Sequence, residues 1–152
     1  MPDENKSSVI NNGVLKYEDL DHGFRELVAN TPGGEKLANC YQCGTCTAGC
    51  PVSELRESYS PKRILKMALL GMKEQILTSP ELWQCTQCHV CVAHCPQDVR
   101  CADIIRVLRQ LAVGGGYVPQ RLYDEAERID VDLRKERIKL TEELCKQNTG
   151  VK

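Results

Sequence analysis

Two short runs of cysteines are the residues of this sequence best suited to chemistry. The first is Cys40-Tyr-Gln-Cys43-Gly-Thr-Cys46-Thr-Ala-Gly-Cys50-Pro51, and the second is Cys85-Thr-Gln-Cys88-His-Val-Cys91-Val-Ala-His-Cys95-Pro96. Both have the spacing C-x2-C-x2-C-x3-C-P, which is typical of proteins that bind two [4Fe–4S] clusters. Three thiolates spaced by two residues can hold one face of a cubane, whereas the fourth cysteine points away from that face. The two motifs therefore predict two [4Fe–4S] clusters.

The fourth cysteine of each motif is expected to bind the cluster of the other motif, as in two-cluster ferredoxins. The predicted ligands of the first cluster are Cys40, Cys43, Cys46 and Cys95, and those of the second cluster are Cys85, Cys88, Cys91 and Cys50. Such a crossing would tie two segments that are distant in sequence into one unit around the metal.

Zinc and disulfide bonds are the competing uses of these cysteines, and both fit the pattern less well. Zinc usually takes two separated pairs of ligands, whereas each motif packs four cysteines into eleven residues. A disulfide framework would need an oxidising compartment. The N-terminal sequence Met-Pro-Asp-Glu-Asn-Lys-Ser-Ser lacks the apolar region of a secretory signal. We therefore expect iron–sulfur chemistry in a reducing, cytoplasmic location.

The composition predicts one small domain with a partly inorganic core. The 152 residues include ten cysteines but one Phe and one Trp, so cluster binding is expected to supply folding free energy. The formal net charge is −1, and no clustered basic face suggests a nucleic-acid partner. No apolar run approaches the ~20 residues that span a bilayer, so no membrane partner is expected.

Helices are predicted around both motifs. An apolar stripe at helical spacing predicts a helix over residues 17–30, and Ser60 followed by Pro61 predicts a helix start between the motifs. A third helix is expected over 98–113. Because no run alternates as a strand would, the predicted fold class is all-α. It is an α-helical ferredoxin domain around two [4Fe–4S] clusters, with helical N- and C-terminal extensions.

Three parts are expected along the chain. They are an N-terminal arm and helix (1–34), the two-cluster α-helical ferredoxin domain (35–113) and a charged helical extension (114–152). The extension carries a narrow apolar stripe that includes Ile129 and Leu133. Two interpretations of this stripe stay open: a solvated helix with a frayed tail, or a docking helix that needs a partner to cover it.

Four further side chains, within or beyond the motifs, are chemically reactive types outside the predicted ligand set. Cys101 is expected to be a buried structural thiol and Cys145 an exposed one. His89 and His94 lie inside the second motif, where no cysteine is missing, so they are expected to lie beside the cluster or to face solvent, and not to act as ligands. The sequence shows no phosphate-binding glycine loop and no nucleophile–base constellation, which indicates electron transfer without a substrate site.

The motifs and their flanks together resemble the C-type subunits of heterodisulfide reductases. The resemblance covers about residues 39–119. It rests on Cys-Tyr-Gln-Cys-Gly-Thr-Cys at 40–46, Ser60-Pro61-x-x-Ile64, Trp83-x-Cys85, Asp98-Val99 and Gly116-Tyr117-Val118-Pro119. The cysteine motifs alone are also similar to other α-helical ferredoxin domains, including those of succinate dehydrogenase and glycolate oxidase relatives.

This resemblance implies a non-catalytic electron-transfer subunit of a soluble oxidoreductase complex. In the family, a flavin- and cluster-containing A-type subunit supplies electrons, and a B-type subunit reduces the disulfide of coenzyme M and coenzyme B in methanogenesis. Hydrogenase or formate dehydrogenase modules are candidate partners through the A-type subunit. The B-type subunit uses paired adjacent cysteines, and no Cys-Cys pair occurs here, so the disulfide chemistry is not expected in this chain.

Other functions remain open at this point. Related complexes use the same type of subunit in sulfur oxidation or in other flavin-based electron bifurcation. A freely diffusing two-cluster ferredoxin and a zinc-bound scaffold without redox activity are further alternatives. The helical segments 14–30 and 118–146 are surplus to a minimal shuttle and favour permanent docking, whereas iron and sulfide analysis would identify a zinc scaffold.

Overall fold

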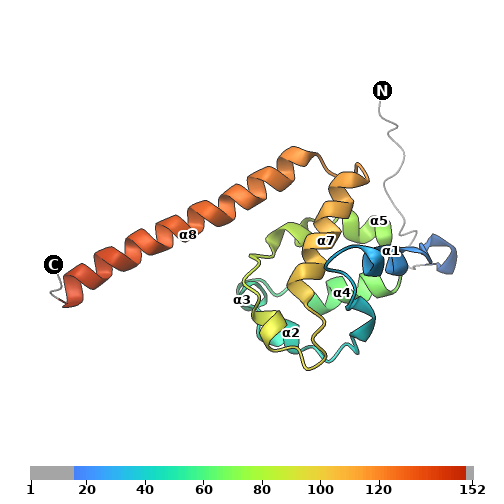
Figure 1. Ribbon diagram of the computed structural model, residues 1–152, viewed down its shortest axis with the longest axis horizontal. Coiled ribbons are helices and arrows are strands. Elements are labelled where there is room, and N and C mark those ends of the chain that lie inside the picture. The colour runs from blue at the N-terminus through green and yellow to red at the C-terminus, as the bar shows by residue number, and fades with distance from the viewer. Residues whose placement is uncertain (1–15, 150–152) are drawn as a thin grey trace. The chain divides into compact units, whose positions relative to one another are not determined.

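The structure, a computed structural model, describes residues 16–149 and contains no strand among them (Figure 1). The chain divides into two compact units, one ending at Tyr117 and the other beginning at Val118. The α-helices of the first unit are α1 (Phe24–Asn30), α2 (Thr45–Ala48), α3 (Pro51–Leu55), α4 (Pro61–Leu69), α5 (Lys73–Leu77), α6 (Val90–Ala93) and α7 (Cys101–Gly114). The 3-10 helices are η1 (Tyr17–Asp19), η2 (Leu37–Asn39) and η3 (Pro80–Gln84). The predicted all-α fold is confirmed, and the division into three parts stays a prediction.

The core of the first unit is built on α4 and α7, which pack against each other (Figure 1). Helix α4 buries Ile64 and Leu65 there, and α7 buries the face that its spacing predicts, which includes Ile105 and Leu108. Helix α1 packs against both α4 and α7, α5 packs against the same pair, and η3 packs against α7. This small apolar core supports the cysteine motifs, which lie on α2, α6 and the turns before and after them.

The helix predicted over residues 17–30 is interrupted in the structure. It forms η1 and then α1, because a turn between them is held from outside: the backbone N–H of Asp21 donates to the carbonyl of Gly71 at 2.9 Å. The Asp21 carboxylate accepts from the N–H of Gly23, just before α1 begins. Phe24 and Val28 of the apolar stripe are buried, whereas Leu27 of the same stripe is 43% exposed, so the stripe is buried only in part.

The helix predicted from residue 98 begins at Cys101 instead. Asp98 and Arg100 have φ values of 48° and 60°, in the left-handed region that a right-handed helix cannot use. Ion pairs stabilise the turn before α7. Asp98 pairs with Lys36, and the Arg100 guanidinium lies 2.8 Å from the Asp103 carboxylate. The turn therefore depends on contacts that hydrophobic spacing does not reveal.

The start of α4 matches its sequence signal. The Ser60 hydroxyl accepts from the backbone N–H of Arg63 at 3.2 Å, and Pro61 occupies the first helical position. A second contact joins this cap to the first cysteine motif, since the Thr47 and Ser60 hydroxyls lie 3.1 Å apart. The Thr47 hydroxyl also accepts from the N–H of Lys62 at 3.1 Å. The cap of α4 thus fixes the motif as well as the helix.

Removal of this cap is expected to weaken the fold measurably. Ser60→Ala leaves the N–H of Arg63 without its acceptor, so the free energy of unfolding should fall by about 1 kcal/mol. Anaerobic urea unfolding of the cluster-loaded protein, followed by circular dichroism, measures the loss. Ser58→Ala is the matched control, because Ser58 is exposed and its hydroxyl contacts the exposed Arg56 side chain. Equal stability of the two variants would contradict the assigned cap.

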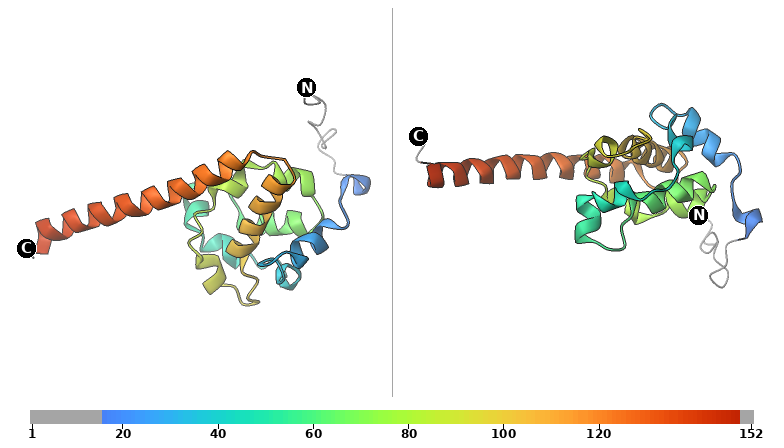
Figure 2. Two further views of the ribbon diagram at one scale, coloured as in Figure 1. Left: turned by 45° about the horizontal axis from the view of Figure 1, so that its top comes forward. Right: turned by 90° about the horizontal axis from the view of Figure 1, so that it is seen from below.

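The second unit contains α8 (Gln120–Thr149), a single uninterrupted helix (Figure 2). Ile129 and Leu133 of its apolar stripe are exposed, and an ion pair between Arg121 and Glu125 lies along its surface. Both interpretations of this stripe, a solvated helix and a docking helix, stay open. Among residues 16–149, no helix combines the length and apolarity that a membrane crossing requires.

Candidate metal centres

The two cysteine motifs fold with the same local backbone. Gln42 and Gln87, the third residues of the motifs, have φ values of 64° and 52°, and Gly44 and His89, the fifth residues, have φ values of 91° and 60°. Each motif then enters a one-turn helix, α2 or α6, and these two helices pack against each other. Left-handed residues turn the chain sharply between cysteines, so that their side chains converge. The repeat in sequence is therefore also a repeat in structure.

Each group of four predicted ligands lines a hollow of its own. The first hollow, of about 370 Å³ including its open mouth, is lined by Cys40, Cys43, Cys46 and Cys95. The second hollow, of about 320 Å³, is lined by Cys50, Cys85, Cys88 and Cys91. In each hollow, three cysteines come from one motif and the fourth comes from the other. This grouping is the one that the crossed assignment requires.

Side-chain amides contact equivalent sulfurs in the two motifs. The Gln42 amide nitrogen donates to Cys40 Sγ at 3.1 Å, and the Gln87 amide nitrogen lies 3.4 Å from Cys85 Sγ. The sequence analysis missed both glutamines, although the shared Cys-x-Gln-Cys spacing of the motifs is a signal for them. Hydrogen bonds to ligand sulfurs are one means by which proteins set cluster reduction potentials.

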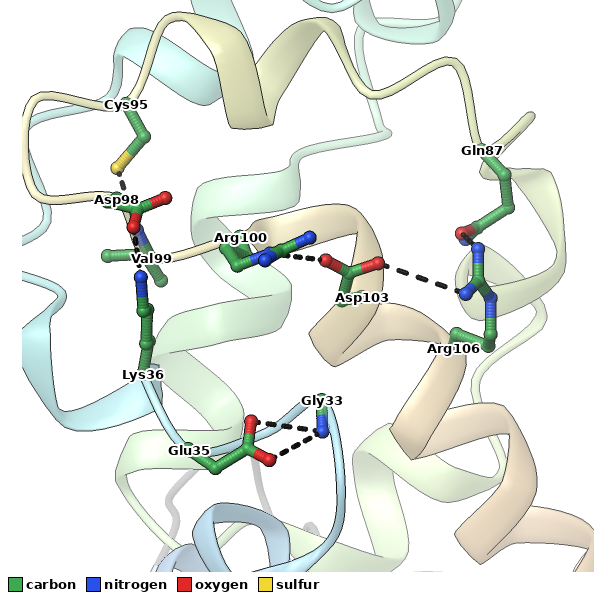
Figure 3. Close-up of polar contacts among 10 residues, drawn as sticks. All are labelled: Gly33, Glu35, Lys36, Gln87, Cys95, Asp98, Val99, Arg100, Asp103 and Arg106. Carbon is green, nitrogen blue, oxygen red and sulfur yellow. Dashed lines mark hydrogen bonds and ion pairs between the residues drawn. The ribbon is translucent and has the colours of Figure 1, made fainter.

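Backbone and polar contacts surround Cys95 Sγ near the start of α7 (Figure 3). The N–H of Val99 donates to Cys95 Sγ at 3.4 Å, next to the ion pair between Asp98 and Lys36. Farther along α7, the Arg106 guanidinium donates to the side-chain oxygen of Gln87 at 3.3 Å. The segment formed by Val99 and α7 therefore contacts Cys95 of the first hollow directly and Cys85 of the second through Gln87.

Cys101 joins the two hollows. Its thiol is buried and can donate a hydrogen bond to Cys46 of the first hollow or to Cys91 of the second. These bonds are the main reason why the pKa of Cys46 is lowered to about 6 and that of Cys91 to about 7. The same bonds raise the pKa of Cys101 well above its ordinary value. The predicted burial of Cys101 is confirmed, but its place between the hollows was not foreseen.

The other cysteines differ in their surroundings. Burial raises the pKa of Cys40 and of Cys85, whereas the Thr45 hydroxyl, 3.3 Å from Cys43 Sγ, lowers the pKa of Cys43. Cys145 is exposed, as predicted. Thiolates are the form that binds metal, and a lowered pKa increases their share at neutral pH.

The donor set of each hollow fits a [4Fe–4S] cluster. Such a cluster takes four thiolates, one at each iron, and each hollow offers four cysteine side chains around a space rather than at a single point. In residues 16–149, no group of three or more His, Cys, Asp or Glu side chains converges as a site for one metal ion. In the first hollow, Leu65 and Val99 add apolar walls, as Ile105 does in the second.

Two large side chains near the second hollow escaped the sequence analysis. Tyr59 lines this hollow and is 1% exposed, and burial, with the neighbouring Cys85, raises the pKa of its phenol. Arg109 is also buried and binds the carbonyl of Cys85. Trp83 faces Arg109, with its ring centroid 5.4 Å from the guanidinium carbon. His89 lines the second hollow and His94 is exposed.

The cysteine region matches a known family of domains. Residues 36–99 match the family model described as a 4Fe–4S dicluster domain. This range includes the eight cysteines that line the two hollows. The family description agrees with the chemistry of the donor set.

Curated relatives carry names that match the resemblance found in the sequence. The chain is 43% identical over 110 residues to the C2 subunit of the H(2)/formate:CoB-CoM heterodisulfide,ferredoxin reductase of Methanococcus maripaludis, a match that spans 68% of this chain and 59% of the relative. It is 44% identical over 110 residues to the iron-sulfur C 2 subunit of the CoB--CoM heterodisulfide reductase of Methanocaldococcus jannaschii, spanning 68% and 58%.

A third relative is the C-type subunit of the H(2):CoB-CoM heterodisulfide,ferredoxin reductase of Methanothermobacter thermautotrophicus. It is 35% identical over 105 residues, spanning 69% of this chain and 56% of the relative. The chain thus spans somewhat more than half the length of the curated relatives that it matches.

Proposed function

Because the chain carries a 4Fe–4S dicluster domain and is homologous to the C-type subunits of heterodisulfide reductases, we propose that it is an electron-transfer subunit of a heterodisulfide reductase-type complex. The observation that carries this proposal is the sorting of eight cysteines into two hollows of four. Each hollow supplies the thiolates for one [4Fe–4S] cluster. When bound, each cluster accepts and releases one electron at a time.

The residues around the hollows hold the ligand cysteines and limit their movement during electron transfer. The one-turn helices α2 and α6 fix the third cysteine of each motif, and the prolines that follow the fourth cysteines, Pro51 and Pro96, restrict the chain there. The amides of Gln42 and Gln87 donate to ligand sulfurs and so favour the more negative, reduced state.

The names of the relatives imply a complex with other subunits, and the proposed partners are those of the family that the sequence resembles. Electrons would arrive from a flavin- and iron–sulfur-containing A-type subunit and leave to a disulfide-reducing B-type subunit. Reduction of one disulfide to two thiols consumes two electrons and two protons, so this chain would pass two single electrons for each disulfide. The disulfide formed by coenzymes M and B is the proposed terminal substrate, because the relatives' names include it.

Iron and acid-labile sulfide analysis tests the cofactor part of the proposal. The protein, purified under strict anaerobic conditions, is expected to contain about eight iron and about eight sulfide per chain. Reduction with dithionite should produce the electron paramagnetic resonance (EPR) signal of reduced [4Fe–4S] clusters. Stoichiometric zinc without sulfide would refute this proposal and support the scaffold.

Anaerobic affinity purification tests the complex. A tagged chain isolated from its native cells is expected to bring partners of the A and B types in fixed stoichiometry. A monodisperse, cluster-loaded monomer without partners would contradict the complex and favour a freely diffusing ferredoxin. Partners from a sulfur-oxidising system would keep electron transfer but replace the proposed terminal substrate.

A further inference from the structure

Arg109 is the one buried charged residue in the part of the chain that the structure describes. It lies on α7 and is 2% exposed. Its Nε donates to the carbonyl of Leu82 at 2.7 Å, and its Nη2 donates to the carbonyl of Cys85 at 2.6 Å. The Trp83 ring covers the guanidinium, 5.4 Å from ring centroid to Cζ. Arg109 thus holds the segment that leads from η3 into the second cysteine motif.

The charge of Arg109 has no acidic counter-ion among residues 16–149. None of the ion pairs within that range includes it. A buried charge is costly unless an opposite charge compensates it, and two carbonyl dipoles compensate it only in part. The group that the second hollow is suited to hold is an anion, since a cubane with four thiolates carries about two negative charges when oxidised. Reduction adds one more, so a nearby cation favours the reduced state.

The two hollows differ in the burial of the positively charged residue near them. In the first, the basic residue on the wall is Lys62, which is only partly buried. Arg109 is instead shielded from water and touches the ligand residue Cys85, whose pKa its charge lowers against the stronger opposing effect of burial. A cation in such a low-dielectric position acts more strongly than one that water screens. The effect of Arg109 should therefore fall mainly on one cluster.

We propose that Arg109 is a positioning residue that holds Cys85 in its ligand position and selectively favours reduction of the cluster in the second hollow. This inference rests on the proposed function, because it requires the chain to bind two clusters. It does not depend on the partners or on the terminal substrate. Its readout is the reduction potential of each cluster, which a residue needed only for folding would not shift selectively.

Anaerobic, EPR-monitored redox titration of the full chain tests the proposal. Arg109→Gln is expected to lower the equilibrium constant for reduction of the second cluster at least tenfold. This corresponds to a fall of about 59 mV in its reduction potential for a one-electron couple. The first cluster should shift much less. Arg109→Lys keeps the charge and should restore much of the potential. Cys43→Ser and Cys88→Ser, which alter one exposed ligand in each hollow, assign the two signals to their clusters.

Lys66→Gln is the control for the loss of a positive charge from the surface. Lys66 is exposed on α4, so its loss should shift the second cluster much less than Arg109→Gln does. Equal shifts of both clusters in Arg109→Gln, or no shift, would overturn the proposal. So would an equal effect of Lys66→Gln.

If Arg109→Gln is too unstable for a redox titration, its iron content and helicity test the proposal instead. Loss of about four iron per chain, with native helicity and an unchanged first cluster, would support the positioning role. Loss of both clusters or of helicity would refute it, because Arg109 would then be a general folding residue. If the unmodified chain itself lacked iron and sulfide, the proposed function would fail first, so the two failures are distinguishable.

Discussion

Cys50→Ala should abolish the cluster of the other cysteine motif and leave the cluster of its own motif in place. Cys50 follows Cys46 in sequence, but its side chain lines the second hollow with Cys85 and Cys88. Without it, the second cluster has three thiolates, and loss of one ligand is expected to make that cluster labile. Iron content should fall from about eight to about four per chain.

Anaerobic alkylation followed by peptide mass spectrometry shows which cluster is lost without any spectral assignment. In Cys50→Ala, Cys85 and Cys88 should become reactive, whereas Cys40 and Cys43 stay protected. Cys95→Ala is the mirror control and should expose Cys40 and Cys43 instead, because Cys95 lines the first hollow. If each variant instead exposed the other cysteines of its own motif, the crossed ligand assignment would be wrong.

Gly34→Ala should destabilise the first unit strongly. A Cβ at Gly34 would lie 1.9 Å from the carbonyl oxygen of Val28, at the end of α1. This neighbour is backbone, so α1 or the loop after it must move as a whole. We expect a loss of about 3 kcal/mol or more in the free energy of unfolding, the upper range for overpacking. Anaerobic denaturant unfolding of the loaded protein measures it.

Gly114→Ala is the matched control for this substitution. Gly114 is the last residue of α7, and a Cβ there would meet no atom within 4 Å. Because alanine is the better helix former by about 1 kcal/mol at most, stability should stay equal or rise slightly. An equal loss of unfolding free energy in the two variants would show that the close approach of Gly34 to the Val28 carbonyl is not the reason why glycine is required there.

The repeated motif was sufficient to predict the chemistry. Two copies of C-x2-C-x2-C-x3-C-P restrict the donors to thiolates in groups of four, and this restriction is local in sequence. The helices were also predictable where local signals act alone. Ser60 and Pro61 start α4 as expected, and the spacing of apolar residues found the buried face of α7.

Local prediction failed where individual hydrogen bonds and ion pairs determine the backbone conformation. The break before α1 depends on a hydrogen bond from Asp21 to Gly71, which is far away in the chain. The late start of α7 depends on left-handed residues at Asp98 and Arg100, which ion pairs with Lys36 and Asp103 accompany. Hydrophobic periodicity contains no information about such contacts, because it records only which face of an element is buried.

The sequence by itself determined the kind of centre in this protein: eight thiols in two repeated motifs, set in an all-helical chain. The tertiary structure alone decided what surrounds those thiols. It placed Cys101 between the two hollows and the buried charge of Arg109 against one ligand segment. The physical reason is that ligand type follows from residue identity and spacing. Burial and several of the hydrogen bonds, in contrast, arise only when distant elements such as α7 pack beside the motifs, and they are expected to make the two proposed clusters different.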